Sequence, residues 1–173
     1  EVFIMAFDGF VISNIISELN KQIIGGRIYK IYQPEADEIT LVIKKERLTT
    51  RLHLSASASL PLVYLSKEGK ANPMQAPNFC MLLRKHISSG RIISITQPDF
   101  ERIIEIKIEH LDELGDVCQK RLIVEIMGKH SNIIFVNSDD VILDSIKHIS
   151  ANISSVREVL PGRTYTFPPS KGK

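Results

Sequence analysis

Two stretches of the chain carry apolar residues at the spacing of an amphipathic helix. Over residues 10–24 the apolar positions recur every three or four residues, namely at Val11, Ile12, Ile15, Ile16, Leu19 and Ile23. Asp8 precedes this stretch, where its carboxylate can accept from the free N–H groups of a first turn, and Gly25 follows where helices commonly end. Residues 78–89 predict a second helix, which Gly90 ends. Its apolar stripe consists of Phe79, Leu82, Leu83 and Ile87.

Nine other stretches are short, rich in β-branched and aromatic residues, and separated by turn-forming residues. They cover residues 28–33, 39–45, 51–55, 62–66, 91–96, 100–110, 120–127, 132–137 and 141–147. Most connections between them have the length of a hairpin, whereas a parallel α/β fold needs a helix after nearly every strand. The pattern therefore predicts an α+β domain built on antiparallel sheet.

The chain is expected to hold one domain followed by the start of a linker. Residues 161–173 contain three of the eight prolines and end in a polar run, which is typical of a linker. Met5 marks the expected natural start of the protein. We therefore expect residues 5–168 to form the domain, residues 1–4 to be extraneous to it, and residues 169–173 to lead to further domains.

The composition is that of a globular domain, with 43% hydrophobic and 24% charged residues. The formal net charge of +2 does not by itself indicate a nucleic-acid partner. Cys80 and Cys118 lack a zinc-binding spacing, no apolar run approaches the roughly 18 residues of a membrane span, and no secretion signal is visible. These features favour a reduced, cytoplasmic chain with no membrane insertion, no metal and no cofactor.

Positive charge gathers in residues 67–91, which contain five bases and one acid. The second predicted helix would present Arg84 and Lys85 to solvent, beside a loop that contains Asn72. Such a surface can contact a phosphate backbone, where several cations act together. The alternative is an ordinary solvated helix face, because charged runs often serve only solubility.

An acidic run follows, since residues 99–116 hold seven acids against Arg102 and Lys107. If residues 100–110 alternate as a regular strand, Arg102 shares a face with Ile104 and Ile106. An arginine in that position extends to water, pairs with a carboxylate inside the protein, or is held ready to grip a partner.

A polar turn joins two predicted strands within residues 125–132. Lys129, His130, Ser131 and Asn132 could form a hydrogen-bonding ledge for a ligand, or they could cap a hairpin loop locally. The spacing of these residues does not separate the two interpretations.

No constellation of catalytic residues stands out in the sequence. The five histidines lack a metal-binding spacing, and the chain contains no GxSxG, Walker-type or GxGxxG sequence. Ser131 lies beside His130 but has no third partner in sequence. We therefore expect a binding module rather than an enzyme.

Several segments, taken in order, resemble one known protein family. They are Met5-Ala6-Phe7-Asp8-Gly9, Gly26-Arg27-Ile28, Asn72-Pro73, residues 77–86, Phe100-Glu101-Arg102-Ile103 and residues 125–132. Over residues 5–168 the chain is similar to the N-terminal NFACT domain of the family that includes fibronectin-binding protein A, RqcH and the nuclear export mediator factor. The resemblance implies an antiparallel β-sandwich with flanking helices, similar to the N-terminal domain of formamidopyrimidine-DNA glycosylase.

The resemblance also implies a role in ribosome-associated quality control. Members of the family bind a large ribosomal subunit blocked by peptidyl-tRNA, and they recruit tRNA so that the stalled chain receives a C-terminal tail, which is alanine in bacteria. The implied partners are therefore tRNA, in particular alanine tRNA, and the large ribosomal subunit. Because the ribosome makes the peptide bond, the family acts as an elongation-type factor.

The family pattern implies which residues contact tRNA. Asp8 falls on the acidic position of the opening motif, and Arg102 falls on the arginine of an Asp-Arg pair in which Glu101 replaces the aspartate. Under this resemblance Arg102 is an arginine held ready for RNA. The complete set of expected tRNA-binding residues is Asp8, Arg84, Lys85, Glu101, Arg102, Lys129, His130, Ser131 and Asn132.

Two other functions stay open on the sequence. One is a surface adhesin that binds fibronectin, as the family name suggests, although the sequence shows no secretion signal, wall anchor or repeat. The other is a nucleic-acid lyase of the glycosylase type, which uses an N-terminal proline as nucleophile, whereas Ala6 follows Met5 here. The expected location is cytoplasmic and ribosome-associated, with the cell surface as the alternative.

Overall fold

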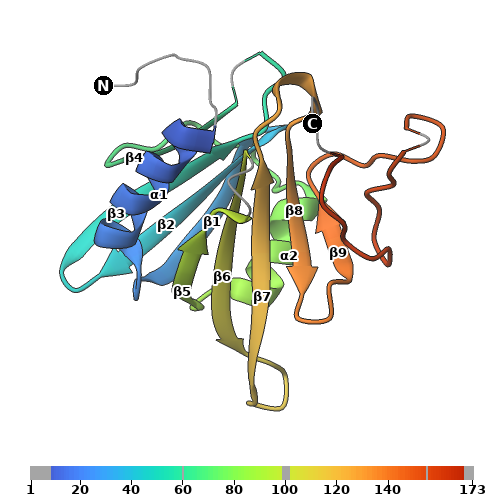
Figure 1. The fold of residues 1–173 in the computed structure, drawn as a ribbon. Helices are drawn as coiled ribbons and strands as arrows, with labels where there is room; N and C mark the ends of the chain where they lie inside the picture. The colour runs from blue at the N-terminus through green and yellow to red at the C-terminus, as the bar shows by residue number, and fades with distance from the viewer. Residues whose placement is uncertain (1–8, 60, 99–101, 155, 170–173) are drawn as a thin grey trace.

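A computed structural model describes residues 9–59, 61–98, 102–154 and 156–169, and in these residues nine strands form one antiparallel sheet (Figure 1). The strands are β1 (Arg27–Glu35), β2 (Glu38–Lys45), β3 (Leu48–Ser55), β4 (Leu62–Ser66), β5 (Arg91–Thr96), β6 (Ile103–Leu111), β7 (Val117–Glu125), β8 (Asn132–Asn137) and β9 (Ile142–Ser145). Their order in the sheet is β4-β3-β2-β1-β5-β6-β7-β8-β9. With the two helices described below, this confirms the prediction of an α+β domain on antiparallel sheet.

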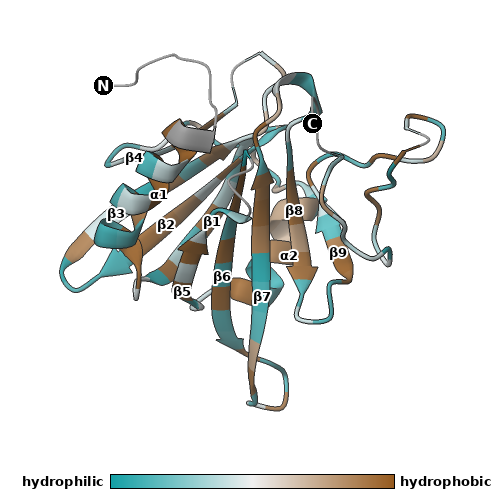
Figure 2. Cartoon of the chain, in the orientation of Figure 1, coloured by the Kyte–Doolittle hydropathy of each residue, from teal (hydrophilic) through white to brown (hydrophobic). Residues whose placement is uncertain are grey.

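The sheet consists of two halves that meet at one corner. β1 pairs with β5 only at Arg27 and Arg91, and beyond this pair the two strands separate. One half is therefore β4-β3-β2-β1, and the other runs from β5 to β9. Figure 2 shows apolar residues along the central strands of both halves. A single hydrophobic core takes side chains from each half, among them Ile31, Leu41, Ile106 and Phe135.

Helix α1 (Gly9–Ile23) packs its apolar face against β5 and β6. The side chains that it contributes to the core are Ile12, Ile16, Leu19 and Ile23, as the periodicity predicts. Gly25 follows with φ +85°, a left-handed conformation that glycine adopts without the strain of a Cβ. Asp8, the expected cap of this helix, lies outside the described residues.

Helix α2 (Asn78–Ile87) contacts β1, β6 and β9, and so it bridges the two halves of the sheet. It buries Cys80 completely, whereas Leu82 of the predicted stripe is only partly buried. The reason is that the helix packs against β1 as well as against β6, which widens and turns its buried face. No helix in the described parts of the chain is long and apolar enough to cross a membrane.

The junction between α2 and β5 is tightly packed around Gly90. A Cβ at this position would lie 2.8 Å from Ile108 Cγ2 and 3.0 Å from the backbone oxygen of Ile87. The predicted end of the helix at Gly90 is thus close to the observed end, and the glycine is required by the approach of its neighbours.

The β6–β7 hairpin is longer on one arm than the sequence pattern predicts. β7 begins at Val117, three residues before the expected start, because its first residues pair with β6 as far as Leu111. At the other end, β6 begins at Ile103, and residues 99–101 lie outside the described part.

The C-terminal segment, residues 146–169, returns along the outer strands of the second half. It makes isolated bridges between Val141 and Thr164 and between Ile149 and Val159. A second, smaller core lies beneath it on the opposite face of the sheet from the main core, formed by Ile103, Ile123, Ile134, Val136, Ile142, Val159 and Tyr165.

Candidate nucleic-acid interface

A bulge in β1 places two neighbouring side chains on the outside of the sheet. The register between β1 and β2 shifts between Ile28 and Lys30, so Tyr29 is an extra residue in β1. Tyr29 is 52% exposed. Lys44 Nζ lies 3.6 Å from the centroid of its ring and Lys30 Nζ lies 5.4 Å from it. These cation–π contacts hold one aromatic ring and two ammonium groups together at the surface.

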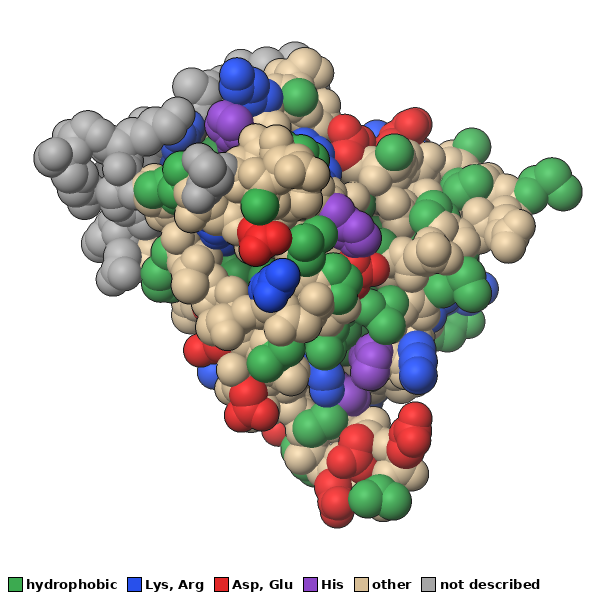
Figure 3. Space-filling model, turned by 90° about the vertical axis from the view of Figure 1, so that its right-hand side faces the viewer, with side chains coloured by type: hydrophobic (Ala, Val, Ile, Leu, Met, Phe, Trp, Pro, Cys, Tyr) green, Lys and Arg blue, Asp and Glu red, His purple; other side chains and the backbone are tan. Residues whose placement is uncertain are grey.

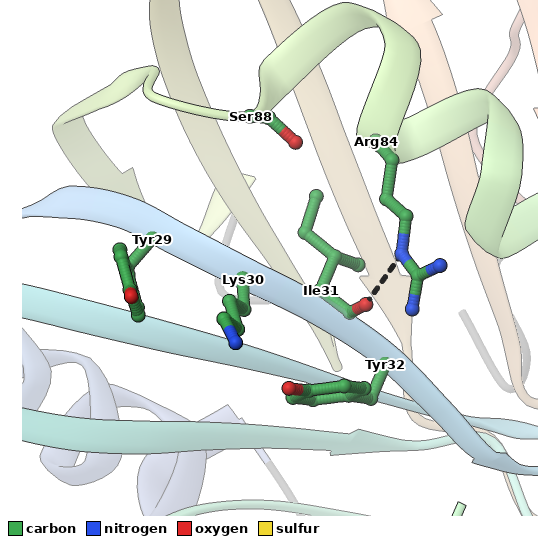
Figure 4. Close-up of a pocket in the computed structure, with 6 residues that line it drawn as sticks. All are labelled: Tyr29, Lys30, Ile31, Tyr32, Arg84 and Ser88. Atoms are coloured by element: carbon green, nitrogen blue, oxygen red, sulfur yellow. Dashed lines mark hydrogen bonds between the residues drawn. The ribbon is translucent and has the colours of Figure 1, made fainter.

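Helix α2 reaches the free edge of β1 through Arg84 (Figure 4). Arg84 Nε donates to the backbone oxygen of Ile31 at 2.8 Å, beyond the corner where β1 and β5 pair. The guanidinium carbon lies 5.8 Å from the ring centroid of Tyr32. Arg84 is therefore fixed at Nε, and its two terminal nitrogens have no hydrogen-bond partner in the part of the chain that the structure describes.

These residues line a shallow hollow of about 320 Å³, formed by Tyr29, Lys30, Ile31, Tyr32, Arg84 and Ser88. Figure 4 shows the side chains of Tyr29, Lys30 and Tyr32 along β1 with Arg84 reaching down to them from α2. We call the side chains of Tyr29, Lys30, Tyr32, Lys44 and Arg84 the β1–α2 surface.

A second hollow of about 130 Å³ continues on the other side of Tyr32, and Asn72 and Arg51 contribute to its lining. Lys70 also lines it and forms an ion pair with Glu38 at 2.9 Å. The hydrogen bond to Glu38 raises the pKa of Lys70. Arg51 donates to the backbone oxygen of Lys67. Lys70 is therefore neutralised by a carboxylate, whereas Arg51, like Arg84, gives one nitrogen to a backbone oxygen and keeps its positive charge.

The β1–α2 surface combines one exposed aromatic ring, Tyr29, and one partly buried ring, Tyr32, with three cations. Aromatic rings and guanidinium planes stack on unpaired bases, while arginine and lysine donate to phosphate oxygens. The arrangement is therefore chemically suited to contact a nucleic-acid strand. In the described ranges, no group of three or more His, Cys, Asp or Glu side chains could hold a metal ion.

The structure separates the two helix cations that the sequence analysis grouped. Lys85 is exposed on α2 but faces away from the hollow that Arg84 lines, since consecutive helical residues point about 100° apart. Its charge acts instead on His86: burial, followed by the charges of Lys120 and Lys85, lowers the pKa of His86.

Other expected contact residues meet at the end of the sheet where β6 begins and β7 ends. The backbone N–H of Ile126 donates to the oxygen of Arg102 at 2.8 Å. Lys129 and His130 follow in a 3₁₀ turn over Gly128–His130, and the side chains of Arg102, Lys129 and His130 are all exposed. Asp8 and Glu101 fall outside the described residues.

The structure bears on one of the three interpretations of Arg102. β6 starts at Ile103, and Arg102 lies in a bend directly before it, opposite Ile126 of the main core. Arg102 is exposed, as expected for an arginine that extends to water from the end of an apolar face.

Ser131 and Asn132 are enclosed by the protein, being only 1% and 3% exposed. Ser131 Oγ accepts from the N–H of Met127 at 2.8 Å. Asn132 Oδ1 accepts from the N–H of Lys147, and its Nδ2 donates to the oxygen of Lys147, both at 3.0 Å. These contacts match the local capping interpretation, so the expected ledge retains only the side chains of Lys129 and His130 at its surface.

A buried ion pair next to this turn was missed by reasoning from sequence. Glu125 is 2% exposed and accepts from the two terminal nitrogens of Arg157 at 3.0 and 2.6 Å, and from Tyr165 Oη at 2.7 Å. Burial and the charge of Glu125 raise the pKa of Tyr165. A carboxylate in the otherwise apolar run of β7 is the signal that could have indicated a buried partner.

Comparisons with known proteins connect this fold to named relatives. The family model for NFACT N-terminal and middle domains matches residues 8–173. The Rqc2 homolog RqcH of Bacillus subtilis is 42% identical over 170 residues, which cover 98% of this chain and 30% of that protein. The human ribosome quality control complex subunit NEMF is 25% identical over 133 residues, which cover 77% of this chain and 12% of that protein.

A solved structure agrees with the fold described above. The N-terminal domain of the fibronectin-binding protein PavA from Streptococcus pneumoniae matches with a TM-score of 0.91 and 43% identity, over 95% of this chain and 63% of that chain. The chain thus spans less than a third of the length of the RqcH and NEMF relatives.

Proposed function

Because this chain belongs to the family of NFACT N-terminal and middle domains, we propose that it is the tRNA-binding part of a ribosome quality control factor. The names of its RqcH and NEMF relatives support this role. In the proposed function the chain contacts tRNA and a large ribosomal subunit blocked by peptidyl-tRNA, at the ribosome in the cytoplasm. It brings tRNA, alanine tRNA in the bacterial case, for C-terminal tailing of the stalled chain. The ribosome makes the peptide bond, so the chain contributes binding and no catalysis.

The observation that carries the proposal is the fixed position of Arg84 beside the tyrosines of β1. Its Nε is held by Ile31, so the terminal nitrogens can donate to phosphate without a large loss of side-chain freedom. Tyr29 offers an exposed ring on which a base can stack, and Lys44 lies against that ring. Cations that neutralise the phosphate charge of RNA, together with a ring that stacks on a base, suit recognition of RNA by shape more than by sequence.

The turn at the end of β7 supplies a second proposed contact. Arg102, Lys129 and His130 are exposed there and can donate to phosphate. Ser131 and Asn132 serve this contact indirectly by holding the turn in place. Asp8 and Glu101 remain proposed tRNA contacts because of the family resemblance. Lys85 remains one because its side chain is exposed.

The test is binding of fluorescently labelled alanine tRNA to the chain over a series of salt concentrations. We expect Arg84→Gln to weaken binding several-fold and to lower the slope of log K against log salt by about one, as expected for one lost phosphate contact. Lys21→Gln is the matched control, because Lys21 is an exposed cation on α1 outside both hollows. Circular dichroism of each variant confirms that the fold is retained.

Equal affinity and equal salt slope for native protein, Arg84→Gln and Lys21→Gln would contradict the role of the β1–α2 surface. The same series with Arg102→Gln tests the second contact. If only Arg102→Gln weakens binding, tRNA lies at the β7 turn; if neither variant does, the tRNA proposal itself fails for this chain.

A fibronectin-binding adhesin is the second candidate, because the similar PavA domain carries that name. Binding of the chain to immobilised fibronectin, with and without competing tRNA, separates the two. Fibronectin binding that survives excess tRNA and the Arg84→Gln change would favour adhesion through another surface.

A further inference from the structure

A cysteine, a histidine and a lysine meet near the tip of the β6–β7 hairpin, away from the β1–α2 surface. His110 and Cys118 are directly paired across the two strands, and Lys120 lies two residues along β7 on the same face. Cys118 Sγ lies 3.2 Å from His110 Nε2. Lys120 Nζ lies 3.1 Å from the same nitrogen and 3.6 Å from the sulfur. The register of the hairpin thus brings a nucleophile, a base and a cation together.

The tautomer of His110 is set by its other ring nitrogen. Nδ1 lies 3.1 Å from the backbone oxygen of Leu111, which can only accept, so Nδ1 carries the proton. The lone pair of Nε2 then faces both the thiol of Cys118, at 3.2 Å, and the ammonium of Lys120, at 3.1 Å. A nucleophile within reach of a base, with the base oriented by a third group, is the geometry that activates cysteines in proteins. Burial, reinforced by the charge of Lys120, lowers the pKa of His110, so the imidazole is neutral at pH 7.

The groups that face this cluster come from α2 and from the hairpin tip. The ring of His86 on α2 meets His110 edge to face at 6.4 Å between centroids. Asp112 and Glu113 in the tip contribute charges to His110 and His86 respectively. In Figure 3 histidine side chains lie beside basic side chains, directly above the acidic tip of the molecule.

The two cysteines of the chain lie in opposite environments. Cys80 is fully buried in the main core, where burial raises the pKa of its thiol. Cys118 is partly exposed and next to a base and a cation. Thiol reactivity is controlled by exposure and by the groups that favour the thiolate, so the two cysteines provide a contrast within one protein.

We propose that Cys118 is a modification site, a nucleophilic thiol that exchanges with low-molecular-weight disulfides. His110 Nε2 accepts the thiol proton, and the Lys120 ammonium stabilises the charge on the sulfur. Sγ then attacks one sulfur of the disulfide, the disulfide bond breaks, and a mixed disulfide forms on Cys118. The leaving thiolate takes the proton from the imidazolium and departs as a free thiol, so electrons and protons balance with the disulfide as the only oxidant. This site is independent of the proposed RNA contacts.

The experiment measures the reaction of the native chain with 5,5′-dithiobis(2-nitrobenzoate) from pH 5 to pH 9. We expect one fast-reacting thiol at pH 7, on the order of tenfold faster than the thiol of glutathione in the same buffer. Cys118→Ser abolishes the fast phase, and Cys80 reacts only after denaturation. Incubation with oxidised glutathione, followed by mass spectrometry of the intact chain, then gives one adduct that is absent in Cys118→Ser.

His110→Gln and Lys120→Met test the activating groups. His110→Gln slows the reaction at pH 7 about tenfold and moves the rise of the rate to higher pH, while Lys120→Met slows it less. His148→Gln is the matched control, because His148 is exposed and its partner is Asp144. Lys120→Met also keeps the test valid if His110→Gln does not fold. A Cys118 thiol no faster than glutathione, or equal rates and pH profiles in native protein and Lys120→Met, overturns the proposal.

Discussion

The carboxylate of Glu125 shows how one residue ties distant parts of this chain together. It ends β7 and is enclosed by Arg157 and Tyr165, which lie 32 and 40 residues later in the sequence. Burial alone would lower the pKa of Arg157, but the hydrogen bonds and charge of Glu125 outweigh it and raise that pKa. Removing one partner of such a pair leaves a buried charge without compensation, which costs more than the pair itself contributes.

Arg157→Met is therefore expected to lower the free energy of unfolding by about 3–5 kcal/mol, because it leaves Glu125 buried and without its counter-ion. Urea denaturation of the native chain and the variant measures this change. Arg163→Met is the control, since Arg163 and Glu158 form a more exposed pair at 3.8 Å that is worth about 0–1 kcal/mol. Similar losses in both variants would contradict the role of the buried pair.

At the same scale, the sequence predicted where polar residues lie along the chain better than it predicted what their side chains contact. The polar turn after β7 was expected, but Ser131 and Asn132 turn inward because backbone groups of Met127 and Lys147 need partners there. Whether a polar side chain in a turn is buried depends on which loop packs over it. The pattern of residue types along the chain does not contain that information. The role of Tyr29 was missed for a related reason, since a bulge changes the alternation that assigns residues to faces.

At the scale of elements, the hydrophobic periodicity predicted both helices and all nine strands, mostly to within a few residues. It succeeded because the strands are short apolar runs, several of them buried on both faces, that are bounded by turn-forming residues. The pattern missed the first three residues of β7, Val117 to Gln119, which are mostly exposed and pair with the end of β6. The end of a strand is thus set by pairing with the neighbouring strand where the strand propensity of its residues does not determine it.

The junction of α2 and β5 yields a prediction about packing. Gly90→Ala introduces a methyl group 2.8 Å from Ile108 Cγ2, next to the fixed backbone oxygen of Ile87, so we expect a loss of about 1–3 kcal/mol in stability. Thermal denaturation measures it. Gly69→Ala is the comparison, because the nearest atom there is 3.1 Å away on the flexible side chain of Arg51. A destabilisation by Gly69→Ala as large as that by Gly90→Ala would show that the close approach is not the cause.

At the scale of the whole molecule, the two halves of the sheet explain why the candidate interface could not be read from the sequence. β1 leaves β5 after a single pair, and α2 fills the resulting opening with Arg84. The residues of the β1–α2 surface thus come from three elements that are separated along the chain. Sequence clustering identified Arg84 by its basic neighbours, but only the fold pairs it with the tyrosines.

The molecule is also expected to lose stability in mild acid. Burial lowers the pKa of His53, His86 and His110 below their ordinary value of 6.5 in the folded chain. The unfolded chain binds these protons more readily, so this contribution to stability is present above pH 6.5 and is lost as the pH falls below it. Urea denaturation at pH 7.5 and pH 5.5 measures the difference. His53→Gln should reduce the loss of stability between pH 7.5 and pH 5.5. If the variant loses as much stability as the native chain, protonation of His53 is not the cause.

The C-terminal segment has a consequence for how the protein avoids self-association. β9 is the last strand of the sheet, and residues 162 and 163 occupy hydrogen-bonding groups of Ile142 on its outer side. An uncovered outer strand offers its backbone to any other extended chain, which is a route to domain swapping and to fibrous aggregates. The contacts of Glu125 with Arg157 and Tyr165 therefore hold the C-terminal segment against the outer side of β9. A chain cut before Arg157 would expose the backbone of β9 to pairing with other chains.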